Sequence, residues 1–344
     1  MARLVRRPTM VLLAAVVWVT AFGALDLVTR DLSLFGTLSL AAVGTALFCP
    51  PAYAAVIGAY AFAWSIVLGV EGDYFTPLHL LRLGISLFVV VSAIVLATVR
   101  ERRERSFARL EDVALAAQRA LLRPIPERVG PTRLAARYRS AAEGALVGGD
   151  FYEAVLTPFG VRIIVGDVVG RGLDAVGLSG LILGGFREAA LTAPDLVALA
   201  HRLDGMTTVY GRGTDFATAL LAELADGEVR LASCGHPSPL LVGPGASATP
   251  LELPPTLPLG YGATPRPRTV AILPGQRLLL YTDGIAEARD ADGRFFDLEA
   301  EAGRALADES AEEGLDRLLD RLDAFAGGAL RDDVALLVVG TASA

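Results

Sequence analysis

The sequence predicts an α+β layered sandwich that follows a region of four transmembrane helices. Two observations support this. Long apolar runs separated by short polar breaks fill residues 9–99 and contribute most of the apolar excess in a chain that is 53% apolar. After residue 131 the pattern changes to short aliphatic segments that come in neighbouring groups, with helical blocks between the groups. Grouped strands favour an α+β arrangement over a strictly alternating parallel sheet.

Four apolar stretches each approach the roughly 20 residues that a helix needs to cross a bilayer. They cover about residues 10–28, 33–49, 53–70 and 79–98. The first stretch could instead be a signal peptide, because arginines precede it, but its apolar run is long and further spans follow. We therefore interpret residues 1–99 as a transmembrane region.

Arginines flank this region on both sides, and positive residues favour the cytoplasmic face. They are Arg3, Arg6 and Arg7 before it, and Arg100, Arg102, Arg103 and Arg105 after it. Both ends are then cytoplasmic, which agrees with an even number of spans and predicts a multi-pass protein of the cell membrane with its C-terminal domain in the cytoplasm. The acids Asp26 and Asp31 lie near a predicted helix end, which favours anchoring over transport. A small-ligand sensor remains open as an alternative.

Residues 100–125 form a predicted helical linker, which ends at the two prolines of "RPIPERVG". Its apolar residues alternate in spacings of three and four, which is typical of a coiled-coil seam about two heptads long. They are Phe107, Leu110, Ala114, Ala117 and Leu121. This pattern predicts either a homodimer through residues 101–122 or an amphipathic helix that lies on its own domain.

The rest of the chain, residues 126–344, is interpreted as one domain. Aliphatic segments predict strands at 161–168, 215–224, 228–236, 276–284 and 333–340. Apolar periodicity predicts helices at about 173–192, 194–210, 297–308 and 311–326.

Separated acids lie at the edges of these hydrophobic segments. They are Asp150, Asp167, Asp283, Asp332 and Asp333. One such acid is ordinary turn chemistry, and neighbouring glycines such as Gly284 allow tight turns and close backbone approach. As a set, however, carboxylates on strand ends suit Mg²⁺ or Mn²⁺, and no histidine has the spacing of a zinc ligand. Oxygen-only sites of this kind typically serve phosphoryl chemistry with two metal ions.

Other classes of protein fit the composition less well. The net charge of −7 argues against a general nucleic-acid binder, which needs a basic surface. Cys49 and Cys234 are isolated, so the sequence predicts neither a disulfide framework nor a cysteine metal site.

Seven ordered motifs resemble the PPM family of metal-dependent protein serine/threonine phosphatases and, more narrowly, its bacterial SpoIIE-like branch. They are "VGGDFYEAV", "IIVGDVVGRGLDAVGLSGLI", "FATALLAEL", "ASCGHPSPLLV", "LPLG", "LLLYTDGIAEARDADGRFF" and "RDDVALLVV". The resemblance covers about residues 115–341. It implies an αββα sandwich with a binuclear Mn²⁺ or Mg²⁺ centre at one edge of the two sheets.

The resemblance also implies roles for the acids. Asp167 matches the ligand that bridges both metals, with the carbonyl of Val168 on one of them. Asp283 and Asp332 match the remaining direct carboxylates. Asp150 matches a position that binds a metal directly or through water. Asp333 matches a flanking polar position. In such a site a metal-bridging hydroxide attacks phosphoserine or phosphothreonine in line, without a covalent phospho-enzyme.

Two residues depart from the family pattern. Val169 stands where eukaryotic members usually carry a histidine, and Arg171 replaces the histidine of the bacterial "GHG". The leaving group must therefore be protonated by metal-bound water or another group. Arg171 could contact phosphate, because a guanidinium binds it bidentately, or could be a surface arginine beside a turn. We interpret His236 in "CGHPSP" as a residue that packs in a turn rather than as a base.

The resemblance predicts a membrane-anchored phosphatase that acts on a phosphorylated STAS-type anti-sigma-factor antagonist. It also implies that the helix at about 173–192 is a switch whose position completes the metal site. Two alternatives remain: a catalytically silent module that signals by partner docking, and a different two-metal hydrolase such as a nucleotidase. The retained acids argue against the silent module, because degenerate members should lose ligands first.

Overall fold

The computed structural model of the protein describes residues 8–29, 34–71, 76–141, 148–225, 227–307, 310–328 and 330–340. By internal contacts the chain divides into two compact units, Met1–Arg109 and Leu110–Ala344. Each unit is described by itself.

The first unit consists of apolar helices. They are α1 (Pro8–Thr29), α2 (Phe35–Phe48), α3 (Pro51–Glu71) and the first part of α4 (Pro77–Leu121). By length and composition α1, α3 and α4 could each cross a membrane, whereas α2 is a shorter apolar helix. Large apolar side chains such as Leu13 and Phe88 are exposed, which is compatible with membrane anchoring. Helix α4 includes both the fourth predicted span, 79–98, and the helical part of the predicted linker, because it runs from Pro77 to Leu121 without a break.

The second unit is a sandwich of two antiparallel sheets covered by helices, as predicted. The six-stranded sheet contains β1 (Arg128–Val129), β2 (Thr132–Arg139), β11 (Val334–Gly340), β10 (Arg277–Tyr281), β7 (Leu240–Gly243) and β8 (Ser247–Pro250), in that order. The five-stranded sheet contains β3 (Phe151–Thr157), β4 (Gly160–Val168), β5 (Ala217–Ala225), β6 (Glu228–Cys234) and β9 (Arg268–Ala271), in that order.

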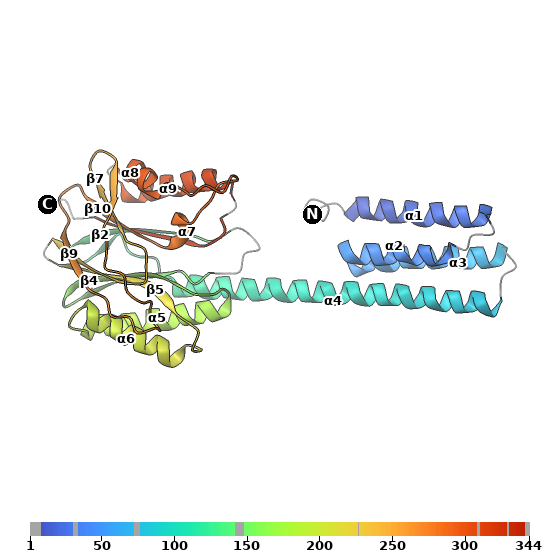
Figure 1. Ribbon diagram of the computed structural model, residues 1–344, viewed down its shortest axis with the longest axis horizontal. Coiled ribbons are helices and arrows are strands. Elements are labelled where there is room, and N and C mark those ends of the chain that lie inside the picture. The colour runs from blue at the N-terminus through green and yellow to red at the C-terminus, as the bar shows by residue number, and fades with distance from the viewer. Residues whose placement is uncertain are drawn as a thin grey trace. The chain divides into compact units, whose positions relative to one another are not determined.

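Helices cover the outer face of each sheet, so the layers run α–β–β–α (Figure 1). Helices α5 (Leu173–Thr192) and α6 (Leu196–Tyr210) pack on the five-stranded sheet. Helices α8 (Leu298–Ala305) and α9 (Ala311–Ala326) pack on the six-stranded sheet. A short helical turn, α7 (Asp283–Ala286), follows β10 directly, which is why the predicted strand 276–284 ends early.

The central strands are buried on both faces, which explains their unbroken aliphatic sequences. In β10, Leu278 and Leu280 lie between the sheets, whereas Leu279 faces the layer of α8 and α9. In β4, Ile163 lies between the sheets and Ile164 faces α5 and α6. Because successive side chains of a strand point to opposite faces, each of these strands supplies two hydrophobic cores at once.

The last part of α4 packs on its own domain. Ala114 is buried against Val176 of α5, and Ala117 and Leu121 pack on the same cluster. By contrast, Phe107 is exposed, as are Leu110 and Val113. The predicted seam therefore divides into a C-terminal half that covers the domain and an N-terminal half that stays exposed.

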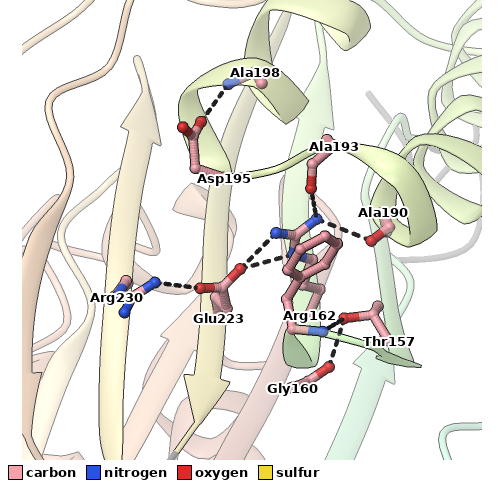
Figure 2. Close-up of polar contacts among 10 residues, drawn as sticks. Thr157, Gly160, Arg162, Ala190, Ala193, Asp195, Ala198, Glu223 and Arg230 are labelled. Atoms are coloured by element: carbon pink, nitrogen blue, oxygen red, sulfur yellow. Dashed lines mark hydrogen bonds and ion pairs between the residues drawn. The ribbon is translucent and has the colours of Figure 1, made fainter.

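A buried ion pair between β4 and β5 also contacts the C-terminal end of α5 through its arginine (Figure 2). The guanidinium of Arg162 in β4 is fully buried and donates two hydrogen bonds, 2.6 and 2.8 Å long, to one carboxylate oxygen of Glu223. Its remaining nitrogen donates to the carbonyls of Ala190 and Ala193, at 2.9 and 2.7 Å. These two carbonyls lie at the end of α5, where a helix leaves carbonyls without partners of its own.

Candidate metal centre

The strand register brings the predicted site acids to one edge of the sandwich. Asp150 precedes β3 and Asp167 lies near the end of β4, and these strands pair antiparallel with Phe151 opposite Gly166. Asp283 follows β10 and Asp332 precedes β11, and these strands also pair antiparallel. The five-stranded and six-stranded sheets therefore each contribute two of the acids.

These carboxyl groups lie near enough to raise one another's pKa. Burial, and then the charge of Asp167, raises the pKa of Asp150 well above its ordinary value. Burial, and then the charge of Asp283, raises the pKa of Asp167 to about 7. Burial, and then the charges of Glu287 and Asp332, raises the pKa of Asp283. Negative charge is therefore costly here, and a divalent cation would relieve that cost.

Thr282 holds Asp150 in place. Its hydroxyl donates a hydrogen bond of 2.6 Å to Asp150 Oδ2 and accepts one of 2.8 Å from the backbone amide of Ala335. The side chain is fully buried. Our reading of the sequence missed this residue, although a polar side chain at the end of an aliphatic strand was a visible signal.

Asp333 is buried and fixes the backbone beside the site. Its carboxylate accepts hydrogen bonds from the hydroxyl of Tyr138 and from the amides of Ala141 and Gly148, at 2.8 and 3.0 Å for the two amides. Its backbone also explains Gly284, because a Cβ there would lie 1.9 Å from the carbonyl oxygen of Asp333. Gly284 is not among the residues with positive φ, so close packing and not a left-handed turn requires glycine.

Arg171 lies at the acid cluster and pairs with Asp332. Its guanidinium donates 2.9 Å to Asp332 Oδ2 and 3.1 Å to the carbonyl of Arg331. Both side chains of the pair are about half exposed. This arginine therefore stands beside the candidate ligands, where it balances part of their charge.

The residues fit a hard divalent cation by chemistry. The donors are carboxylates together with the carbonyl of Val168, which lies where a Cβ on Gly149 would meet it at 2.6 Å. Among the described residues, no three acidic, histidine or cysteine side chains converge closely enough to hold an ion. Asp150 and Asp167 do lie within hydrogen-bonding reach of each other, so the described carboxylates approach as a pair and not as a set of three.

His236 is not an acid–base candidate. It is buried, and burial lowers its pKa to about 4, so the ring is neutral at physiological pH. Both ring nitrogens are hydrogen-bonded within the protein, which supports our interpretation of a packing residue. Val169 offers no proton either, so neither position supplies the leaving-group acid.

A cavity of about 300 Å³ opens beside Asp332. Small and apolar residues line part of it, and charged side chains line the rest. The lining residues are Gly284, Glu287, Ala288, Arg289, Ala326, Leu330, Arg331 and Asp332. The cavity therefore adjoins Asp332, one of the candidate ligands.

Comparisons with known proteins agree with this geometry. The family model of stage II sporulation protein E (SpoIIE) matches residues 157–342, which is more than half of the chain. The structure of the RsbU and RsbW domains of a Mycobacterium tuberculosis protein is 28% identical, with a TM-score of 0.51; the match covers 61% of this chain and 59% of that one. The present chain thus spans less than two thirds of that relative's length.

Two further structures share the fold. The SiaA-PP2C domain of Pseudomonas aeruginosa is 20% identical, with a TM-score of 0.58, and the match covers 70% of this chain and 98% of that one. A serine/threonine phosphatase of S. agalactiae is 11% identical, with a TM-score of 0.52, and the match covers 61% and 99%. By this family match the chain belongs to the stage II sporulation protein E (SpoIIE) family, and its second unit shares the fold of PP2C-type phosphatase domains.

Proposed function

We propose that the protein is a membrane-anchored serine/threonine phosphatase that dephosphorylates a regulatory protein, a STAS-type anti-sigma-factor antagonist. The observation that carries the phosphatase part is the gathering of acids from both sheets at one edge, with raised pKa values. The choice of a STAS substrate rests on the resemblance to the SpoIIE branch.

In this proposal the acids hold two Mn²⁺ or Mg²⁺ ions. Asp167, the carbonyl of Val168, Asp283 and Asp332 are the direct ligands, and Asp150 binds directly or through water. When bound, such ions would bind phosphate oxygens and activate a water molecule for in-line attack. Asp167 and Asp283, one from each sheet, are the residues on which catalysis should depend most.

In this proposal Arg171 binds the substrate phosphate, in addition to its ion pair with Asp332. An exposed ion pair contributes at most about 1 kcal/mol, so a cation at Asp332 can readily displace the guanidinium. The freed group would then bind two oxygens of the substrate phosphate, which it suits by its planar geometry. Because neither Val169 nor His236 provides a proton, we expect water to protonate the departing serine or threonine oxygen.

We further propose residues 1–99 as the transmembrane region, 100–125 as the linker and 126–344 as the phosphatase domain. In this proposal the chain is a multi-pass protein with four spans, and its catalytic domain would lie in the cytoplasm. Helix α2 is about 21 Å long, shorter than the roughly 30 Å hydrocarbon core, so it is the span to test. Cysteine accessibility on both sides of α2 distinguishes four spans from three. The exposed Phe107 and Leu110 support a homodimer through residues 101–122.

Phosphatase assays on the full chain in detergent test the activity. With Mn²⁺ it should hydrolyse p-nitrophenyl phosphate and a phosphorylated STAS protein, and Asp167→Ala and Asp283→Asn should abolish both reactions. Asp320→Asn on the exposed side of α9 is the matched control. Metal-independent turnover, or full activity in both variants, would refute the proposal. Absence of Mn²⁺ binding in calorimetry would favour a silent docking module.

A further inference from the structure

We propose that His236 is a positioning residue that joins the two sheets behind the acid cluster and so sets the spacing of the metal-binding carboxylates. This inference rests on the proposed function, because it concerns the same site. His236 follows β6 in a buried position.

The ring of His236 is hydrogen-bonded to both sheets. Nδ1 lies 2.9 Å from the hydroxyl oxygen of Thr218, which belongs to β5 of the five-stranded sheet. Nε2 lies 2.9 Å from the carbonyl oxygen of Tyr281, which ends β10 of the six-stranded sheet. Two polar, directional contacts of one side chain therefore connect the sheets. At this edge they add to the hydrogen bonds of Thr282 with Asp150 and of Gly148 with Asp333, whereas the strands themselves meet through an apolar core.

The direction of each hydrogen bond follows from the partners. A carbonyl oxygen can only accept, so Nε2 carries the hydrogen that is donated to Tyr281. Nδ1 of the neutral ring then accepts from the Thr218 hydroxyl. The hydroxyl of Ser233 also accepts from the amide of His236, at 3.0 Å, and donates to its carbonyl, at 2.9 Å. The backbone that carries the ring is thus fixed as well.

Both partners of the ring are neighbours of candidate ligands. Thr218 lies opposite Asp167 in the register of β4 and β5. Tyr281 is followed directly by Thr282, which holds Asp150, and then by Asp283. Because Asp167 and Asp283 come from different sheets, their separation depends on how far apart the sheets lie at this edge. His236 is placed to fix that separation.

Three variants of the full chain test this role. His236→Phe keeps a ring of similar volume and removes both hydrogen bonds, whereas His236→Gln keeps an amide donor and acceptor. His201→Phe changes an exposed histidine on α6 and serves as the control. Mn²⁺ affinity is measured by calorimetry, and kcat and KM for p-nitrophenyl phosphate are measured at saturating Mn²⁺.

We expect His236→Phe to raise the Mn²⁺ dissociation constant about tenfold, the lower end of the effect seen when outer partners of metal ligands are lost. His236→Gln should recover part of this loss, and His201→Phe should match the wild type. Saturating Mn²⁺ should restore most of the kcat that His236→Phe loses at low Mn²⁺, and KM should stay nearly unchanged. A purely structural role would lower melting temperature without this shift in metal affinity.

Wild-type Mn²⁺ affinity in a folded His236→Phe variant would overturn the inference. If that variant does not fold, Thr218→Val removes one of the two hydrogen bonds at nearly constant volume and should still weaken Mn²⁺ binding. Unchanged affinity in Thr218→Val would then overturn it. Failure of the wild type itself to bind Mn²⁺ would instead refute the proposed function, so the two failures are distinguishable.

Discussion

Replacing Arg162 with methionine should destabilise the C-terminal unit by about 3–5 kcal/mol, because it leaves the buried carboxylate of Glu223 without its main partner. The side chain of Glu223 is only 3% exposed, so water cannot replace the hydrogen bonds that Arg162 donates to it. The carbonyls of Ala190 and Ala193 lose their donor at the same time. In a domain of this size each kcal/mol moves the melting temperature by about 2–4 °C, so a decrease of about 10 °C is expected.

Arg230→Met is the matched control for this experiment. Arg230 pairs with the other oxygen of Glu223 at 2.9 Å, but its side chain is 56% exposed, so its loss should cost at most about 1 kcal/mol. Urea unfolding followed by circular dichroism gives both free energies. Combining Arg162→Met with Glu223→Leu should recover much of the loss, because an apolar pair replaces an unpaired charge. If Arg162→Met lowers the free energy of unfolding by no more than Arg230→Met does, the buried ion pair does not stabilise the packing of α5 on the sheet.

Three further results are expected. Thr282→Val removes the hydrogen bond to Asp150 and should cost about 1–3 kcal/mol in urea unfolding, with Thr282→Ser close to wild type. In EDTA, the free energy of unfolding should fall as pH rises from 4 to 8. The pKa of Asp167 is about 7 in the folded protein and 3.8 ordinarily, so in this pH range the folded state keeps a proton that the unfolded state releases. The loss of stability across the range amounts to at most about 4 kcal/mol. A flat profile would contradict this. Arg171→Ala should leave stability almost unchanged, because its pair with Asp332 is exposed, but should raise KM for p-nitrophenyl phosphate about tenfold; an unchanged KM would exclude a phosphate contact.

The helices were predictable where local signals agreed with tertiary packing. Helix α9 begins after Ser310, whose hydroxyl accepts from the amide of Glu313, and ends at Gly327 in a left-handed conformation. A serine followed three residues later by glutamate, and a glycine beyond the last apolar residue, are both visible in the sequence. The bounds predicted for this helix, 311–326, are confirmed for that reason.

Several strands were missed because their pairing depends on distant partners. Strand β2 carries three arginines and does not read as an aliphatic strand. It is stabilised by pairing with β11 and by ion pairs of Arg137 and Arg139 with Asp316 and Asp323 of α9, far along the chain. Strands β7, β8 and β9 have only four residues each, too few for a periodic signal.

The positions of the candidate acids at one edge of the sandwich follow from strand ends that are visible in the sequence, but the groups that hold these acids do not. Thr282 and Asp150 are 132 residues apart, and Tyr138 and Asp333 are 195 apart. No local pattern encodes such contacts, because they exist only after both sheets have formed and packed. The need for glycine at position 284 also depends on a contact between distant residues, because a Cβ there would collide with the backbone carbonyl of Asp333.

This dependence links metal binding to the fold of the sandwich. Asp150 and Asp167 come from one sheet and Asp283 and Asp332 from the other, so ions held by all four would connect the sheets at the edge where their charges repel. A ligand at 100 times its dissociation constant stabilises the folded state by about 2.7 kcal/mol. That gain is of the same order as the cost of ionising Asp167 in the folded apo protein at neutral pH. If the proposed site binds Mn²⁺, the arrangement of acids that weakens the apo protein would therefore be the one that makes its stability respond to the metal.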